Sequence, residues 1–175
     1  MPKIIENVRE QLLTEAKRQI AENGYSATTI RSVAGACGLG IGTVYNYFKS
    51  KDMLIASFML EDWRKCLEAM HSGIRTSVDP HTVLRCIYKE LQGFLGAHRA
   101  LFSDSDATKV FSTVFSDRHR QLRSQLAALL RPLCDRSSVE NKDFLAEFVA
   151  ESLLTWTVAG KPFADIFSIL SALLK

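Results

Sequence analysis

The sequence predicts an all-α protein. Apolar residues recur at spacings of three and four along most of the 175 residues, which is the period of an amphipathic helix. No segment alternates apolar and polar residues between turn signals as a half-buried strand does, so we expect no sheet. Glycine, asparagine and proline interrupt the pattern, and these interruptions divide it into about nine expected helices.

Three short helices are expected first. The first ends at Asn23-Gly24, because both residues tolerate the left-handed conformation of a helix terminus. Thr28 or Thr29 can cap the second, which stops at Gly38. The third spans about residues 41–47. The apolar stripe of the first helix consists of Ile5, Val8, Leu12, Ala16 and Ile20.

Two longer helices follow. Ser50 is the expected N-cap of the fourth helix, which closes at Gly73. Asp79-Pro80 opens the fifth, since a cap residue followed by proline is typical of a helix start. A polar stretch over residues 103–106 then breaks the helical pattern.

Four further helices complete the expected fold. Two are expected over residues 106–115 and 117–131, and the second ends near Pro132 because proline cannot continue the backbone hydrogen bonds of a helix. Ser137 and Glu140 match a capping box for the eighth helix. A Gly-Lys-Pro break separates it from the last one.

The composition is that of an ordinary globular protein of one or two domains, with 47% hydrophobic and 23% charged residues. No apolar run reaches the roughly 18 residues that a membrane span needs. The N-terminus alternates charged and apolar residues, unlike a secretory signal. We therefore expect a cytoplasmic protein that does not associate with membranes.

No motif indicates a metal site, a cofactor or an enzyme. The four cysteines form no CxxC pair and the four histidines no i,i+4 pair, although a redox-sensing cysteine stays open. The glycines of residues 38–42 superficially suggest a nucleotide-binding loop, but a helix and not a strand precedes them. GxSxG, HExxH, Walker and paired-carboxylate motifs are missing from the sequence.

Residues 28–55 carry the strongest functional signal. Two short helices joined by a glycine-containing turn match the helix-turn-helix plan. Outside its apolar core the segment presents hydroxyl, amide and cationic groups, which bond phosphate oxygens and base edges. These residues are Thr29, Arg31, Thr43, Tyr45, Asn46, Tyr47, Lys49 and Lys51. Residues 1–52 also hold seven Lys or Arg and five Asp or Glu, which is +2 of the chain's net charge of +3.

This segment closely resembles the TetR family of one-component regulators, whose pattern runs T-T-x-x-I-A-x-x-A-G-V-S-x-G-T-x-Y-x-Y-F-x-x-K-x-x-L. The matching residues are Thr28, Thr29, Val33, Ala34, Gly38, Gly42, Thr43, Tyr45, Tyr47, Phe48, Lys51 and Leu54. The resemblance implies a three-helix DNA-binding domain over residues 1–50. It also implies a helical effector-binding and dimerisation domain over residues 51–175.

The resemblance also implies roles for single residues. Thr29 and Arg31 would contact the phosphate backbone, while Thr43 and Asn46 face the major groove and Gly42 lets the backbone approach it. Further phosphate contacts would come from Tyr45, Tyr47 and Lys51. The alternatives are a solvated surface charge for Arg31 and ordinary half-buried aromatic rings for the two tyrosines.

Two positions depart from the family pattern. Gly40 stands where the family usually has serine, which removes a side-chain cap and one hydroxyl contact. Ile41 stands where polar or cationic residues are common, and it can pack on a thymine methyl group but cannot hydrogen-bond a base. These departures leave the operator sequence open.

Aromatic residues beyond the first domain are interpreted mostly as core. His98, which closes an apolar helix beside Arg99, is the best polar candidate for a pocket that takes a small, largely apolar effector. The candidate effector-binding residues are Trp63, Phe94, His98, Phe102, Phe111, Phe115 and Trp156.

The last two helices are more apolar than a peripheral helix pair needs. Helices of this kind make a four-helix dimer interface in the resembling family. A homodimer also suits a palindromic operator with half-sites about 34–36 Å apart. We therefore expect a ligand-responsive homodimeric regulator, with repression favoured over activation; the rival hypotheses are an enzyme and an all-α protein-interaction adaptor. The apolar residues concerned are Phe144, Phe148, Trp156, Phe163, Phe167 and Leu170.

Overall fold

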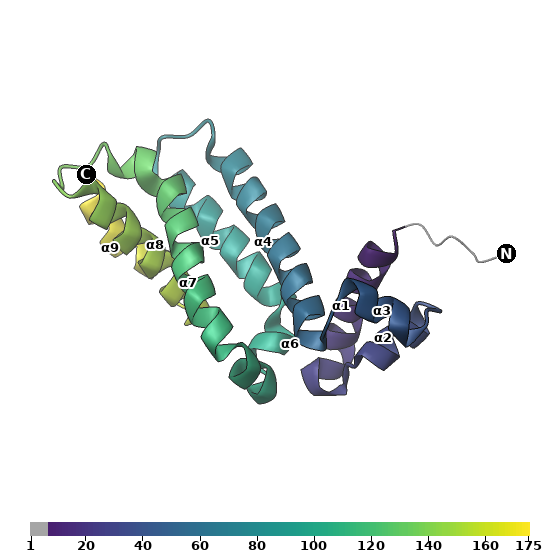
Figure 1. The fold of residues 1–175 in the computed structure, drawn as a ribbon. Coiled ribbons are helices and arrows are strands. Elements are labelled where there is room, and N and C mark those ends of the chain that lie inside the picture. Colours follow the sequence, from purple (N-terminus) through teal and green to yellow (C-terminus); the bar gives the residue numbers. More distant parts are fainter. Residues whose placement is uncertain (1–6) are drawn as a thin grey trace. The chain divides into compact units, whose positions relative to one another are not determined.

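The computed structural model describes residues 7–175, except for the side chains of residues 111–118. Over this range the chain folds into the helices α1 to α9 and contains no strand, which confirms the all-α prediction (Figure 1). The chain divides into two compact units. One comprises the residues up to Arg64 together with His98–Phe111, and the other comprises Lys65–Ala97 and Ser112–Lys175.

The first unit begins with α1 (Val8–Ala27), α2 (Ile30–Ala36) and α3 (Ile41–Tyr47). It also contains the first half of α4 (Lys51–Ile74), and the short α6 (Arg99–Phe102) packs on α1. Figure 1 shows α2 and α3 beside α1. Their shared core includes the fully buried side chains of Leu12, Val33, Val44, Leu54 and Ile55.

Local signals explain the first three helices. Gly24 has φ 80°, so the regular part of α1 breaks where expected, although one more turn follows as far as Ala27. Thr29 caps α2 through a reciprocal capping box with Ser32. Gly38 has φ 66°, a left-handed conformation that turns the chain from α2 to α3. Ile5, expected on the first helix, lies outside the described residues.

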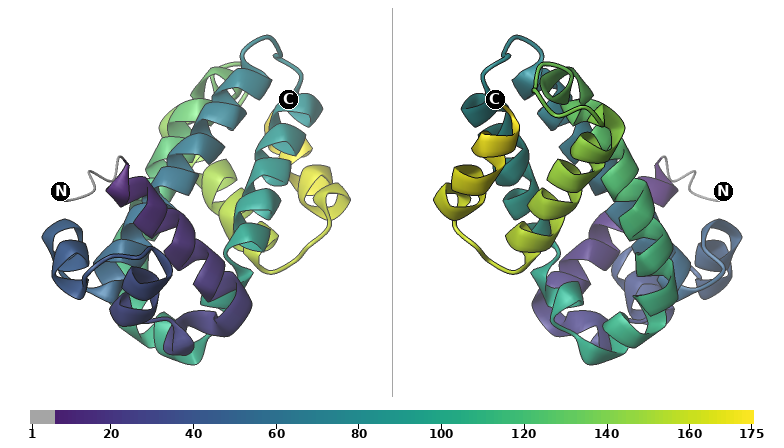
Figure 2. Two further views of the ribbon diagram at one scale, coloured as in Figure 1. Left: turned by 90° about the vertical axis from the view of Figure 1, so that its right-hand side faces the viewer. Right: turned by 90° about the vertical axis from the view of Figure 1, so that its left-hand side faces the viewer.

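The second unit contains the end of α4, α5 (Pro80–Ala97) and most of α7 (Ser105–Cys134). It is completed by α8 (Lys142–Val158) and α9 (Phe163–Leu173). Both α8 and α9 pack on α5 and on each other, as Figure 2 shows. The largest fully buried side chains include Leu84, Ile87, Leu126, Leu130, Leu153 and Leu170.

The sequence predicted two helices over residues 106–115 and 117–131, and this prediction was wrong. The structure has one continuous helix, α7, which passes through Pro132. Proline removes one backbone hydrogen bond, but helical bonding resumes where the Asp135 amide donates to the Arg131 carbonyl at 2.9 Å. The short helix α6 begins at Arg99, directly after His98, and was not among the expected helices. These two differences offset each other, so α1 to α9 match the expected number.

The start of α8 also differs from the predicted capping box of Ser137 and Glu140. Asn141, not Ser137, caps this helix by accepting a 3.0 Å hydrogen bond from the Phe144 amide. The Ser137 hydroxyl instead donates to the Leu173 carbonyl at 2.6 Å and accepts from the Val139 amide. Ser137 therefore ties the α7–α8 loop to the end of α9.

A search of the described residues for a helix long and apolar enough to cross a membrane finds none. The same part of the chain brings no three potential metal-ligating side chains together.

Candidate nucleic-acid interface

The start of α2, the exposed side of α3 and the start of α4 line an open groove of about 440 Å³. Hydroxyl and cationic side chains surround it, and Ile30 and Ile41 are its aliphatic members. The lining contains no acidic residue. The lining residues are Thr28, Thr29, Ile30, Arg31, Ile41, Tyr45, Lys49, Ser50 and Lys51.

The residues predicted from sequence to contact DNA are accessible in the folded unit. Thr43 and Lys51 are half-buried, and the others are exposed. Tyr45 and Tyr47 leave 45% and 46% of their surfaces in solvent, so neither ring is an ordinary core aromatic. The exposed members are Thr29, Arg31, Gly40, Ile41, Gly42, Tyr45, Asn46 and Tyr47.

Thr29 is held in place at the first turn of α2. Its hydroxyl oxygen accepts a 3.0 Å hydrogen bond from the Ser32 amide, and the Ser32 hydroxyl oxygen accepts one of equal length from the Thr29 amide. Ser32 also donates to the Gln19 side chain at 2.6 Å, which anchors the cap on α1. A hydroxyl that accepts can still donate its proton. Thr29 therefore keeps a donor for an oxygen of a bound partner.

The cations of α1 and those of the groove differ in their partners. Those of α1 are matched by carboxylates, and the hydrogen bond from Arg18 lowers the pKa of Glu15 below its usual value. In contrast, within the described residues, the cations of the groove, Arg31, Lys49 and Lys51, form no ion pair with a carboxylate. Positive charge is thus concentrated beside Thr29 and Tyr45, although the carboxylates of Asp52, Asp104 and Asp106 act electrostatically on Lys51. The matched pairs are Arg9–Glu61, Lys17–Asp62, Arg18–Glu15 and Arg18–Glu22.

Lys51 is fixed against the end of α1. Its Nζ donates a 2.9 Å hydrogen bond to the Tyr25 carbonyl oxygen and lies 3.7 Å from the centre of the Tyr25 ring. Partial burial lowers the pKa of the Lys51 amine. The Tyr25 hydroxyl donates to Asp52 at 2.7 Å, and burial, with Asp52 adding to it, raises the pKa of Tyr25. These contacts hold the Lys51 ammonium at the edge of the groove.

Two glycines at the start of α3 leave their positions on its surface without side chains. Gly40 precedes it with φ −68° and provides no side-chain cap, in agreement with the departure noted in the sequence. A Cβ atom on Gly42 would meet nothing within 4 Å, so the fold itself does not require glycine at this position. Lys49 covers the other end of α3 by donating to the Tyr45 carbonyl at 3.2 Å.

The groove includes residues that were not among the contacts predicted from the sequence. Thr28, Ile30 and Ser50 also line it, and their proximity depends on how α2 packs beside the start of α4. Lys49 is predicted from the sequence as an outward-facing cation but is not among the predicted contacts. Its position just after α3 was the signal that would have included it.

Comparison with known families bears on this same segment. Residues 12–58, which span α1 to the start of α4, match the family described as bacterial regulatory proteins of the tetR family. The helix-turn-helix domain of this chain belongs to the tetR family. The match covers the groove and every residue predicted to contact DNA.

Curated relatives match this chain over part of its length. The chain is 34% identical over 65 residues to the fatty acid metabolism regulator protein of Bacillus subtilis (strain 168), which covers 37% of this chain and 34% of that protein. It is 36% identical over 66 residues to the HTH-type transcriptional repressor Rv1474c of Mycobacterium tuberculosis, covering 35% of each. The chain thus spans about a third of the length of these relatives.

Solved structures extend the likeness in fold beyond the tetR domain. A transcriptional regulator from Cytophaga hutchinsonii has a TM-score of 0.68 at 17% identity, covering 94% of this chain and 93% of that one. The fatty acid degradation regulator FadR from Bacillus halodurans has a TM-score of 0.65 at 17% identity, covering 98% and 95%. Both share the fold of nearly the whole chain.

The candidate effector residues are distributed over both units. His98 is buried in the first unit, where it stacks on Phe58 with ring centres 5.8 Å apart and meets Phe102 edge-on at 6.5 Å. Its Nε2 lies 3.1 Å from a carboxylate oxygen of Asp62. Burial lowers the pKa of His98, and Asp62 partly opposes that shift.

The other candidates have different environments. Trp63 is buried and Phe94 is half-buried, whereas Trp156 leaves 47% of its surface exposed on α8. The side chains of Phe111 and Phe115 lie outside the described residues. None of the described candidates lines the cavity of about 510 Å³ that lies between the ends of α4 and α7 in the second unit.

Proposed function

We propose that this protein is a non-enzymatic, DNA-binding transcriptional repressor that acts in the cytoplasm as a homodimer on a palindromic operator. The observation that carries the proposal is the groove of the tetR domain, where three cations without carboxylate partners adjoin exposed hydroxyls. Such groups bind phosphate oxygens. With the backbone clamped there, α3 would enter the major groove, and Thr43 and Asn46 would read base edges beside Gly42.

A mobility-shift titration with the DNA upstream of the protein's own gene, against random DNA of equal length, tests this function. We expect a specific shift that Arg31→Ala and Lys49→Ala each weaken severalfold. Arg18→Ala is the matched control, because Arg18 is already paired with Glu15 and Glu22. Equal affinity for both DNAs, or no shift with either, would contradict DNA recognition and favour a protein-interaction adaptor.

The proposed dimer interface is the outer face of α8 and α9. Phe144, Phe148 and Trp156 lie at four- and eight-residue intervals on α8 with 64%, 44% and 47% of their surfaces exposed. Ile169 on α9 is 67% exposed. An apolar face of this extent is typical of a protein-protein contact, and a two-fold dimer presents two DNA-binding domains to two half-sites.

Sedimentation velocity tests the dimer. We expect Phe148→Glu to convert a dimer to a folded monomer, since the side chain is exposed within one chain and a charge is costly to bury at an interface. Val110→Glu is the control, because Val110 is equally exposed but lies on α7. A wild-type monomer at micromolar concentration contradicts the proposal, as does a Phe148→Glu dimer.

Effector control is the last part of the proposal. A small effector would have to bind one arrangement of the dimer better than another, so that the two DNA-binding domains no longer match the spacing of the half-sites. Candidate contacts remain Trp63, Phe94, His98, Phe102, Phe111, Phe115 and Trp156. Loss of operator binding on addition of an effector, reversed by dilution, is the expected result.

A further inference from the structure

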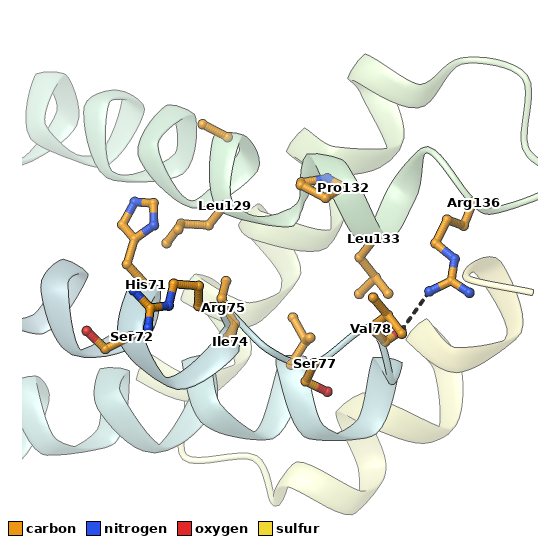
Figure 3. Close-up of a pocket in the computed structure, with 12 residues that line it drawn as sticks. His71, Ser72, Ile74, Arg75, Ser77, Val78, Leu129, Pro132, Leu133 and Arg136 are labelled. Atoms are coloured by element: carbon orange, nitrogen blue, oxygen red, sulfur yellow. Dashed lines mark hydrogen bonds between the residues drawn. The ribbon is translucent and has the colours of Figure 1, made fainter.

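The second unit contains a cavity of about 510 Å³, which is within the usual size range of small-molecule sites. It lies where α4 ends, along the crossing of residues 75–79 to α5, and beside the last turns of α7 (Figure 3). All of its lining residues belong to the second unit.

The middle of this cavity is apolar. Val83 of α5 and Leu129 and Leu133 of α7 are buried and form part of its wall. Val78, on the crossing segment, leaves 67% of its surface exposed at the same cavity. An apolar molecule seated here would remove the Val78 side chain from water, which favours binding.

The charged side chains of the cavity, Arg75 and Arg136, are both cations. His71 also lines the cavity, and no acidic residue does. Figure 3 shows His71 and Arg75 toward one end and Arg136 at the other, with Leu129, Pro132 and Leu133 between them. Within the described residues neither arginine forms an ion pair with a carboxylate. Arg136 makes only a long 3.4 Å hydrogen bond to the Val78 carbonyl among the bonds found there.

We propose that this cavity binds a small amphiphilic organic anion, with an apolar chain along Val83, Leu129 and Leu133 and a carboxylate at one of the arginines. The planar guanidinium group suits a carboxylate because it donates two parallel hydrogen bonds. A cationic amphiphile would meet only like charge. This inference rests on the proposed function, because it names the chemical class of the effector. It places the effector in a different part of the chain from the aromatic residues that the sequence proposed as effector contacts.

Isothermal titration calorimetry with two probes of equal chain length tests the ligand class. Sodium decanoate and nonylammonium chloride carry the same nine-carbon alkyl chain and opposite charges. We expect one decanoate per chain, bound at least about tenfold more tightly than the cation, since hydrogen bonds to charged groups are worth about that much. Equal affinity for the two probes, or no binding of decanoate, overturns the proposal.

Matched variants locate the site. The Arg75→Ala, Arg136→Ala double variant should weaken decanoate binding about tenfold, whereas Arg64→Ala, an exposed arginine outside the cavity, should not. Ala128→Trp fills the cavity from an exposed position on α7 and should abolish binding, and Ser124→Trp, one turn earlier, should retain it. Unchanged binding in both the double variant and Ala128→Trp overturns the assignment.

A mobility-shift measurement on the same preparations separates this inference from the proposed function. DNA binding without decanoate binding overturns the inference alone. Decanoate binding without DNA binding overturns the proposed function and leaves the anion site standing.

Discussion

The ammonium group of Lys51 lies 3.7 Å from the centre of the Tyr25 ring and donates a 2.9 Å hydrogen bond to the Tyr25 carbonyl oxygen. The first contact is a cation–π interaction, and the second adds a side-chain donor to a carbonyl in the last turn of α1 that also accepts from the Thr28 amide. One side chain thus joins the start of α4 to the end of α1 and also lines the groove.

Lys51 is therefore expected to contribute both to stability and to DNA binding. Lys51→Met keeps the aliphatic chain but loses both contacts, and should lower the free energy of unfolding by roughly 1–2 kcal/mol. Lys49→Met is the control and should stay within about 0.5 kcal/mol of wild type, because that side chain is exposed. Urea denaturation measures both. Equal stability of the two variants would show that the Tyr25 contacts contribute nothing.

Gly38 and Gly40 flank the same turn but should respond differently to substitution. Gly38 has φ 66° with open space around it, so Gly38→Ala should cost about 1 kcal/mol through backbone conformation alone. Gly40 has φ −68°, and Gly40→Ser adds a potential cap to α3, so we expect no loss and a gain of a few tenths of a kcal/mol at most. Thermal unfolding compares them. Gly40→Ser as destabilising as Gly38→Ala would refute this account.

His98 should make stability depend on pH. Burial lowers its pKa below the unfolded value of about 6.5, so the unfolded chain binds the proton more readily than the folded one. Its contribution is present above about pH 6.5 and is lost as the pH falls through the lowered pKa. We expect the Tm to fall between pH 7.5 and 5, and to fall less in His98→Phe than in His71→Gln, which alters an exposed histidine. Identical pH profiles for these variants would exclude His98 as the cause.

The buried thiols should be unreactive in the folded protein. Burial raises the pKa of Cys66 to about 12 and that of Cys134 to about 11, so almost no thiolate is present near neutrality. We expect iodoacetamide to modify both only after unfolding, as followed by mass spectrometry with and without urea. Cys37 and Cys86 are half-buried with raised pKa values and should react slowly but first. Rapid labelling of native Cys66 would reopen a redox role.

The sequence predicted the first unit better than the second, because caps and turns there depend on neighbouring residues. Thr29 with Ser32, Gly38, and the bounds of α3 follow from signals within a few positions. Ser137 shows where such reasoning fails. Its spacing to Glu140 matches a capping box, but its hydroxyl bonds to Leu173, 36 residues away, and Asn141 takes over the cap.

The candidate sites also differ in how far local sequence signals predict them. Most groove residues belong to one contiguous motif, so their types and spacing were enough to propose them. The cavity of the second unit joins the end of α4 to the end of α7, more than 50 positions later, and no local pattern relates Arg75 to Arg136. Trp156 was proposed as an effector contact because it is aromatic, although it projects from the exposed face of α8.

The pairing of Arg9, Lys17 and Arg18 with carboxylates sets the ionic-strength response of the protein. Among the described residues that line the groove, Arg31, Lys49 and Lys51 are the cations available to displace condensed counterions, about three per DNA-binding domain. A dimer should then show a slope of about −5 in a plot of log K against log salt concentration. A slope of this size corresponds to a loss of about a thousandfold in affinity between 50 and 200 mM salt, so the release of ions at these few cations would supply a large share of the free energy of DNA binding.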